Sequence, residues 1–299
     1  MDFLIRIILE SILSIYEGSI ALENHGSGME SLIKTRIALG RQKSKLNVIL
    51  MEEPENHLSF ANMHKMLNEI TSKQEQAQMI IATHSSMIAS RLNLNNVLWL
   101  TDGGVKSLAY VKEDVADFFV KADDNGFLQL LLAERSVLVE GATEFLLFPQ
   151  IYKQETGRTI EEDSVAVISC NGISYKNYLN IAEGTSKKIA VLTDNDKKQH
   201  AVNEATEFNN SHENQHIFMG ATDEDWTWEA CFYRLNQKSL QSIITVKNGA
   251  KYLFHEKDYG QYLGYMLNHK VEVAYKMLKS EQKFNIPQYV RDAILWLNS

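Results

Sequence analysis

Two glutamates follow a short apolar segment in the stretch from Val137 to Glu144, VLVEGATE. Glu140 and Glu144 are four residues apart, so they share one side of a helix if a helix begins near Gly141. Carboxylates held together repel one another unless a cation lies between them. The spacing indicates a divalent metal site or, alternatively, an exposed helix N-terminus, where acidic residues interact favourably with the helix dipole.

A second pair of acids, Asp194 and Asp196, follows the apolar segment Ile189 to Leu192. Acid pairs with this spacing arise easily by chance in a chain with 38 acidic residues, so position decides their interpretation. In a parallel sheet the residues that follow the strands meet at one edge, where α/β folds bind ligands. Both pairs are therefore expected to converge on a divalent cation.

The elements that must position these acids alternate between strands and helices. Hydrophobic patterns predict three strands and two intervening helices, which are 135–139, 142–156, 165–169, 175–182 and 188–193. Helical periodicity returns in four later segments, 226–235, 259–267, 271–278 and 289–297. The sequence thus predicts an α/β fold with a parallel sheet, followed by a helical extension.

A strand, helix and strand unit precedes this region. The apolar segments 48–51 and 79–82 have the pattern of buried strands, 60–70 that of a helix, and the residues around Asp102 that of a hairpin turn. The segment 112–133 is charged and is expected to be irregular. The predicted domains are therefore residues 1–111, a linker at 112–133, and residues 134–299.

The upstream unit carries residues suited to nucleotide hydrolysis. Glu52 and Glu53 end one predicted strand, where the first could hold Mg²⁺ and the second could orient an attacking water. His84 follows the next strand, in the place of a γ-phosphate sensor. Ser27 and Gly28 precede a predicted helix whose N-terminus could meet phosphate. Taken singly, these motifs are equally typical of a solvated turn, a capping contact and a flexible loop.

In this order, the upstream motifs resemble the ABC-type ATPase half of the OLD (overcoming lysogenization defect) family of nucleases, over about residues 20 to 100. The resemblance implies a signature-like loop at Ser27 and Gly28, a Walker B strand ending at Glu52 with the catalytic Glu53, and the switch histidine His84. No G-x-x-x-x-G-K-[ST] phosphate-binding loop occurs in the sequence. The chain is therefore expected to begin part-way through an ATPase and to bind ATP only with upstream sequence or an N-terminal partner.

The downstream acids resemble the TOPRIM fold over roughly residues 134 to 200, with Gly172 after the second strand. The resemblance implies that Glu140, Asp194 and Asp196 are catalytic ligands of two Mg²⁺ or Mn²⁺ ions, and that Glu144 completes the second site.

A TOPRIM half after an ABC-type half is the arrangement of the OLD class, which includes the nuclease of the Gabija anti-phage system. That class implies a further metal ligand at Glu229 and a catalytic lysine at Lys270. The alternatives are a surface acid for Glu229 and a solvated lysine for Lys270.

The expected function is a metal-dependent DNA endonuclease regulated by an ATPase, in anti-phage defence or DNA processing. Its expected partners are DNA and further copies of the chain. Two alternatives are a non-catalytic assembly or DNA-sensing module with structural metal, and another TOPRIM enzyme such as a topoisomerase or primase.

Composition sets outer limits on these interpretations. The net charge of −8 argues against a general polyanion binder but not against an enzyme whose acids hold cations. Cys170 and Cys231 form no zinc or disulfide pattern, so a reduced, cytoplasmic setting is expected. Residues 2–14 have amphipathic spacing rather than that of a signal peptide, and no membrane span is expected. Three histidines are placed in a polar loop and not expected to bind metal, namely His200, His212 and His216.

Overall fold

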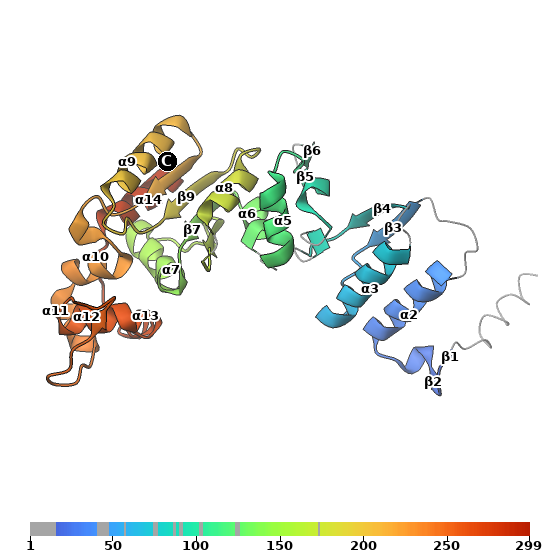
Figure 1. Cartoon of the computed structure of the whole chain (residues 1–299), viewed down its shortest axis with the longest axis horizontal. Coiled ribbons are helices and arrows are strands. Elements are labelled where there is room, and N and C mark those ends of the chain that lie inside the picture. The colour runs from blue at the N-terminus through green and yellow to red at the C-terminus, as the bar shows by residue number, and fades with distance from the viewer. Residues whose placement is uncertain are drawn as a thin grey trace, which may run out of the picture. The chain divides into compact units, whose positions relative to one another are not determined.

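The computed structural model describes residues 16–40, 48–56, 58–73, 77–85, 88–89, 92–101, 104–122, 126–172 and 174–299. The chain divides into two compact units, Met1–Ala89 and Ser90–Ser299, and each is considered by itself (Figure 1). The amphipathic segment predicted at 2–14 lies outside the described residues. The predicted domain limits stay predictions.

The first unit packs two helices against a pair of strands. Its elements are β1 (Tyr16–Glu17), β2 (Ile20–Ala21), η1 (Leu22–Asn24), α2 (Ser27–Gly40), β3 (Val48–Glu52), α3 (Phe60–Lys73) and β4 (Gln78–Ala82). β3 and β4 are parallel, with Val48 opposite Gln78, which confirms the predicted strand, helix and strand unit. α2 begins at Ser27, so Ser27 and Gly28 lie in its first turn rather than before it.

The prediction that β3 and β4 are buried strands is wrong for one of their faces. Alternate residues such as Ile49 and Met51 pack against the buried Leu32 of α2 and Met66 of α3. The residues between them point the other way, and Leu50 is 73% exposed. Apolar composition alone could not distinguish the two faces, because both carry apolar side chains.

The second unit is built on a four-stranded parallel sheet in the order β10-β9-β7-β8. Its elements up to the last sheet strand are η2 (Leu94–Asn96), β5 (Leu98–Thr101), β6 (Gly104–Ser107), α5 (Glu113–Ala122), α6 (Gly126–Leu132), β7 (Arg135–Val139), α7 (Ala142–Thr156), β8 (Val165–Ser169), α8 (Tyr175–Ala182), β9 (Lys188–Leu192), α9 (Gln199–Ser211) and β10 (Gln215–Phe218). The remaining elements are η3 (Asp223–Asp225), α10 (Trp228–Leu235), α11 (Gln237–Ile243), β11 (Leu253–Phe254), β12 (Lys257–Asp258), α12 (Gln261–Asn268), α13 (Lys270–Lys279) and α14 (Gln288–Asn298). The predicted parallel α/β sheet and helical extension are both confirmed.

One face of this sheet joins the helical extension in a single core. Val137 and Val139 of β7 and Leu192 of β9 belong to a buried cluster with residues of α7, α10, α13 and α14. α14 lies against β9 and β10 (Figure 1). The end of α14 is fixed at the amino end of β7, where Arg135 donates a hydrogen bond of 2.7 Å to Asn298. The extension is thus part of the same body as the sheet.

Two segments differ from the sequence-based expectation. The segment 112–133, expected to be irregular, contains α5 and α6, because residues such as Phe119 and Leu130 bury an apolar face. The segment with the three histidines, expected to be a polar loop, forms α9 and the edge strand β10, which pairs with β9. α9 is polar on most of its surface, so its apolar period is weak.

The hairpin predicted around Asp102 is confirmed by its strands, since β5 and β6 pair antiparallel with Thr101 opposite Gly104. Within the described ranges, no helix combines the length and apolar composition that a membrane span requires.

Candidate metal centre

The order of the sheet brings the ends of β7 and β9 to the position where α/β folds bind ligands. β7 lies between β8 and β9, so the strand order reverses between β7 and β9. The carboxyl ends of the strands at such a switch point form a crevice for ligands. Val139 pairs with Leu192 in register, and the next residues, Glu140 and Thr193, therefore leave the sheet side by side.

A hydrogen bond joins these two residues. The hydroxyl of the buried Thr193 donates to Oε1 of Glu140, whose side chain is otherwise exposed. Gly141 then forms the N-cap of α7 in an extended conformation. The first acid of the stretch VLVEGATE is thus fixed to the strand that leads to Asp194.

Asp194 turns into the protein. Its Oδ1 accepts a hydrogen bond of 2.9 Å from the backbone N–H of Trp228, the first residue of α10. Burial raises the pKa of Asp194 well above its ordinary value, and the carboxylates of Glu140 and Glu229 raise it further. A cation would stabilise the charge of a half-buried acid that lies among other acids.

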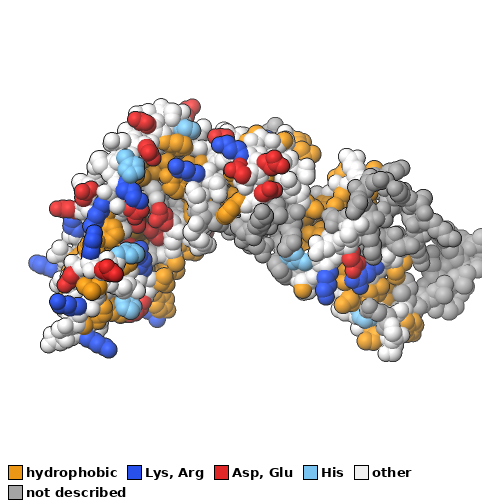
Figure 2. All heavy atoms as spheres, viewed as in Figure 1, with side chains coloured by type: hydrophobic (Ala, Val, Ile, Leu, Met, Phe, Trp, Pro, Cys, Tyr) orange, Lys and Arg blue, Asp and Glu red, His pale blue; other side chains and the backbone are white. Residues whose placement is uncertain are grey.

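Glu144 lies in the first turn of α7 and is 8% exposed. Burial raises the pKa of Glu144 to about 7, and repulsion from Glu229 and Glu140 acts in the same direction. The alternative of an exposed helix N-terminus is therefore wrong for this residue. We call Glu140, Glu144, Asp194 and Glu229 the acid cluster. Figure 2 shows acidic side chains in the area that α7 and α10 occupy in Figure 1.

Glu229 and Lys270 form an ion pair inside the acid cluster. Lys270 Nζ lies 3.0 Å from Glu229 Oε2, and the Glu229 side chain is 1% exposed. Burial alone lowers the pKa of Lys270, but attraction to Glu229, and then to Asp194, raises it above its ordinary value overall. The alternative of a surface acid is therefore wrong for Glu229, whereas the Lys270 side chain is 40% exposed and reaches the buried carboxylate from solvent.

The arrangement agrees with a comparison of sequence families. Residues 131–196 match the model of the TOPRIM domain of overcoming lysogenization defect protein-like proteins. This part of the chain is an OLD-like TOPRIM domain. The match covers Glu140, Glu144, Asp194 and Asp196 and ends before Glu229. No curated protein matches the chain by sequence.

Asp196 of the TOPRIM domain is placed differently from the acid cluster. Its side chain is 60% exposed and its Oδ2 lies 3.3 Å from Lys198 Nζ. Its backbone has a positive φ of 51°, and its N–H donates to the carbonyl of Trp226 at 3.1 Å. The structure therefore fixes the Asp196 backbone and leaves its carboxylate exposed beside Lys198, and its role as a ligand stays a prediction.

TOPRIM domains typically bind divalent metal ions, and the acid cluster supplies the oxygen donors that Mg²⁺ and Mn²⁺ prefer. Within the described ranges, however, no group of three or more His, Cys, Asp or Glu side chains is arranged to hold an ion. The repulsion that raises the pKa of both Glu144 and Asp194 is the observation that fits a cation. The chemistry of the donors thus fits the metal, whereas a closed ligand geometry is not formed.

Sequence reasoning missed several residues of the TOPRIM region. Asn195, between the two predicted aspartates, is buried and donates to the carbonyl of Gly220 at 2.7 Å. A Cβ on Gly220 would lie 2.1 Å from the carbonyl oxygen of Asp225, so only glycine allows this close approach. Burial raises the pKa of Tyr289 of α14 well above its ordinary value, and Cys231 and Asp194 raise it further. The polarity of Asn195 next to two acids was the one signal available.

The first unit assembles part of the predicted nucleotide site. Glu53 has a positive φ of 45°, and its Oε1 lies 3.2 Å from Nε2 of His84. Glu55, which sequence reasoning missed, accepts hydrogen bonds from the Thr83 hydroxyl and from the His84 N–H, the latter at 3.2 Å. A strained backbone at a polar loop is frequent at functional sites.

The other residues predicted for the nucleotide site make no side-chain contact with Glu53 or His84 among the described residues. Glu52 is exposed at the end of β3, Ser27 is exposed and Gly28 is buried in the first turn of α2. No contact found among the described residues links these three to Glu53 or His84. Their roles toward a nucleotide stay predictions.

Proposed function

We propose that this chain is a metal-dependent DNA endonuclease that hydrolyses phosphodiester bonds at the acid cluster of its TOPRIM domain. The observation that carries the proposal is the convergence of Glu140, Asp194, Glu229 and Lys270 at the switch point of a parallel sheet. An acid cluster with a lysine suits phosphoryl transfer. The carboxylates can hold metal ions, and the ions and the lysine can stabilise the negative charge that the anionic substrate gains in the transition state.

Each residue of the site has an assigned part in this proposal. Glu140, Asp194 and Asp196 are the main ligands of the cations, while Glu144 and Glu229 complete the second site. Such ions, Mg²⁺ or Mn²⁺, supply Lewis acidity toward the phosphate and lower the pKa of a bound water.

The ion pair between Lys270 and Glu229 prepares the lysine for its role. Lys270 stabilises the negative charge that develops on the phosphate, and Glu229 keeps the ammonium in place until substrate enters. Thr193 holds the Glu140 carboxylate and so limits its movement toward or away from the cation.

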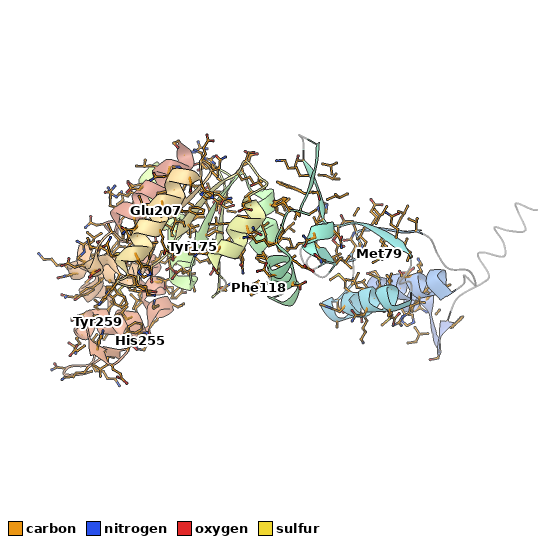
Figure 3. All side chains as sticks on the ribbon, turned by 45° about the horizontal axis from the view of Figure 1, so that its top comes forward. Met79, Phe118, Tyr175, Glu207, His255 and Tyr259 are labelled. Carbon is orange, nitrogen blue, oxygen red and sulfur yellow. The ribbon has the colours of Figure 1, made fainter. Side chains whose placement is uncertain are left out.

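A plasmid assay tests the proposal. The purified protein is incubated with supercoiled plasmid and Mg²⁺, Mn²⁺ or a chelator, and nicked or linear product is expected only with a metal. Asp194→Asn should reduce the rate at least about 100-fold, since a ligand of the reacting centre is lost. Glu207→Gln is the matched control, because Glu207 is an exposed acid on α9 (Figure 3).

Two outcomes would count against the nuclease. Cleavage that persists in chelator would exclude the metal mechanism, and an Asp194→Asn protein as active as the unmutated chain would remove the assigned site. Metal-dependent stabilisation without any cleavage would instead identify a non-catalytic module with structural metal.

We also propose that the first unit contributes to an ABC-type ATPase that regulates this nuclease, in anti-phage defence or DNA processing. The contact between Glu53 and His84 supports it, because a catalytic base and a phosphate-sensing histidine act on the same γ-phosphate. We further propose that the chain acts as a homo-oligomer.

Calorimetry tests the ATPase proposal. This chain by itself should show no saturable ATP binding, whereas a chain completed by upstream sequence or an N-terminal partner should bind. In the completed protein, Glu53→Gln should lower turnover about 100-fold or more and leave binding intact, while Glu30→Gln on α2 should change neither. Micromolar ATP binding by this chain alone would disprove the need for completion.

A further inference from the structure

Four aromatic side chains lie beside the loop that carries Asp194 and Asp196. They are Trp226, Phe254, His255 and Tyr259, and together we call them the aromatic surface. The ring centroid of Trp226 lies 5.2 Å from that of Tyr259 and 6.1 Å from that of Phe254. His255 is exposed and the other three are half-buried, so parts of all four rings reach solvent. Figure 3 labels His255 and Tyr259, and the ring centroid of His255 lies 4.2 Å from that of Phe254.

A fixed hairpin presents three of these rings. β11 and β12 are joined by His255 and Glu256, which both have positive φ and so form the two-residue turn that suits a hairpin. Asn268 of α12 donates to the carbonyl of Leu253 at 3.0 Å, and a Cβ on Gly264 would lie 2.1 Å from the Tyr252 carbonyl oxygen. The hairpin is therefore held closely on α12.

Lys197 connects the aromatic surface to the acid loop. Its Nζ lies 4.6 Å from the ring centroid of Trp226 and 4.9 Å from that of Tyr259, which are cation–π distances. The side chain of Asn195 accepts a hydrogen bond of 2.7 Å from the Lys197 N–H. The chain from Asp194 to Lys197 spans at most about 10 Å. The aromatic surface thus adjoins the loop that carries Asp194 and Asp196.

We propose that the aromatic surface binds an unpaired nucleotide of the DNA strand next to the phosphodiester that is cleaved, an inference that rests on the proposed nuclease function. Aromatic rings bind bases by stacking on their faces, and Lys197 supplies a charge for the adjoining phosphate. Lys257 adds a second charge, since it pairs in register with Phe254. The carboxylate of Asp258 is engaged by the N–H of Gly260 at 2.9 Å.

The same geometry selects against fully paired DNA. In a duplex the faces of the bases are covered by their stacked neighbours, so no face is free for Trp226 or Tyr259. The substrate class is therefore DNA with an unpaired stretch, such as a fork or a segment that negative supercoiling opens in a plasmid, and stacking makes recognition tolerant of sequence.

Binding measured in an Asp194→Asn background tests the inference without requiring cleavage. Fluorescence anisotropy compares labelled oligo-dT, a forked duplex and a fully paired duplex, with Ca²⁺ present. The fork and the oligo-dT should bind more tightly than the duplex. Trp226→Leu and Tyr259→Leu should each weaken binding of both about 5- to 100-fold and leave duplex binding unchanged. Lys197→Met should reduce the slope of log Kd against the logarithm of the salt concentration by about 1.

One further variant is a control, and another tests the surface at an exposed residue. Trp99→Leu should not change DNA binding, although Trp99 also contacts lysines, with Lys187 Nζ 4.9 Å and Lys106 Nζ 5.6 Å from its ring centroid. His255→Ala changes an exposed turn residue, so it should keep the fold and still weaken binding of the fork.

The outcomes separate this inference from the nuclease proposal. Equal affinity for fork and duplex, or unchanged affinity in both Trp226→Leu and His255→Ala, would overturn the inference even if the unmutated chain cleaves plasmid. A change of oligomeric mass with unchanged DNA affinity would assign the surface to contacts between copies and overturn it as well. If the rings are required for binding of the fork but the unmutated chain never cleaves DNA, the DNA-binding role of the aromatic surface is supported and the nuclease proposal is overturned.

Discussion

The hydroxyl of Thr193 donates a hydrogen bond to the carboxylate of Glu140, across the ends of two neighbouring parallel strands. This contact fixes the exposed acid of the cluster to the strand that leads to Asp194. Thr193→Val keeps the shape of the side chain and removes the donor, so plasmid cleavage should fall about tenfold, in line with losing a hydrogen bond to a charged group. Thr193→Ser retains the hydroxyl and should restore most of the rate, whereas equal loss in both variants would contradict the role of the bond.

Neutralising Asp194 should separate metal binding from folding. In the metal-free protein the neighbouring acids disfavour its charge, so Asp194→Asn should keep or raise the melting temperature in chelator. Mg²⁺ should stabilise the unmutated chain, because it binds the folded state, and should stabilise the variant less. A thermal melting series with and without Mg²⁺ measures both effects. A variant that melts lower in chelator, with no dependence on metal, would indicate a purely structural hydrogen-bonded carboxylate.

Glu144 should make the metal-free protein more stable at mildly acidic pH. Its pKa is about 7 in the folded state, above the ordinary value of 4.5, so the folded protein binds more protons than the unfolded chain between these values. Stability therefore falls as pH rises through this window, by about 3 kcal/mol at most. Urea unfolding in chelator from pH 4.5 to 7.5 measures the slope, and Glu144→Gln should reduce it, while the raised pKa of Asp194 leaves a remaining slope of the same sign. An unchanged slope in this variant would show that another group titrates.

Much of this site could be predicted because local patterns fix the elements that carry it. The apolar segments before Glu140 and Asp194 predicted β7 and β9, and the parallel sheet then required both acids to meet at one edge. The ion pair between Glu229 and Lys270 could not be predicted from spacing. It depends on how α10 and α13 pack, which is decided by contacts between residues distant in the sequence.

The errors have a related physical origin. The backbone has positive φ at Asp196 and Lys197, a conformation that lysine seldom adopts and that the pattern around Asp194 did not predict. α9 was missed because its surface is polar, and β10 because an edge strand needs few apolar residues to pair with β9. Pattern reasoning therefore located the acids by strand but could not orient each side chain.

The pair of Glu229 and Lys270 should show strong coupling in a double-mutant cycle. Lys270→Met leaves the Glu229 carboxylate buried without a partner, so urea unfolding should show a loss of about 1–3 kcal/mol, reduced from the fully buried case because Lys270 is partly exposed. Adding Glu229→Gln removes the unpaired charge and should recover most of that loss, which makes the coupling energy measurable. Lys276→Met is the matched control: Lys276 Nζ lies 2.7 Å from Glu272 Oε1 in an exposed pair on the same helix, where less than about 1 kcal/mol is expected. If the double variant is no more stable than Lys270→Met, the acid cluster does not depend on this lysine for its charge balance.

Cleavage should remain low in the double variant even where stability returns, because the ammonium proposed to stabilise the phosphate is absent. Recovery of cleavage would show that Lys270 has no part in the reaction.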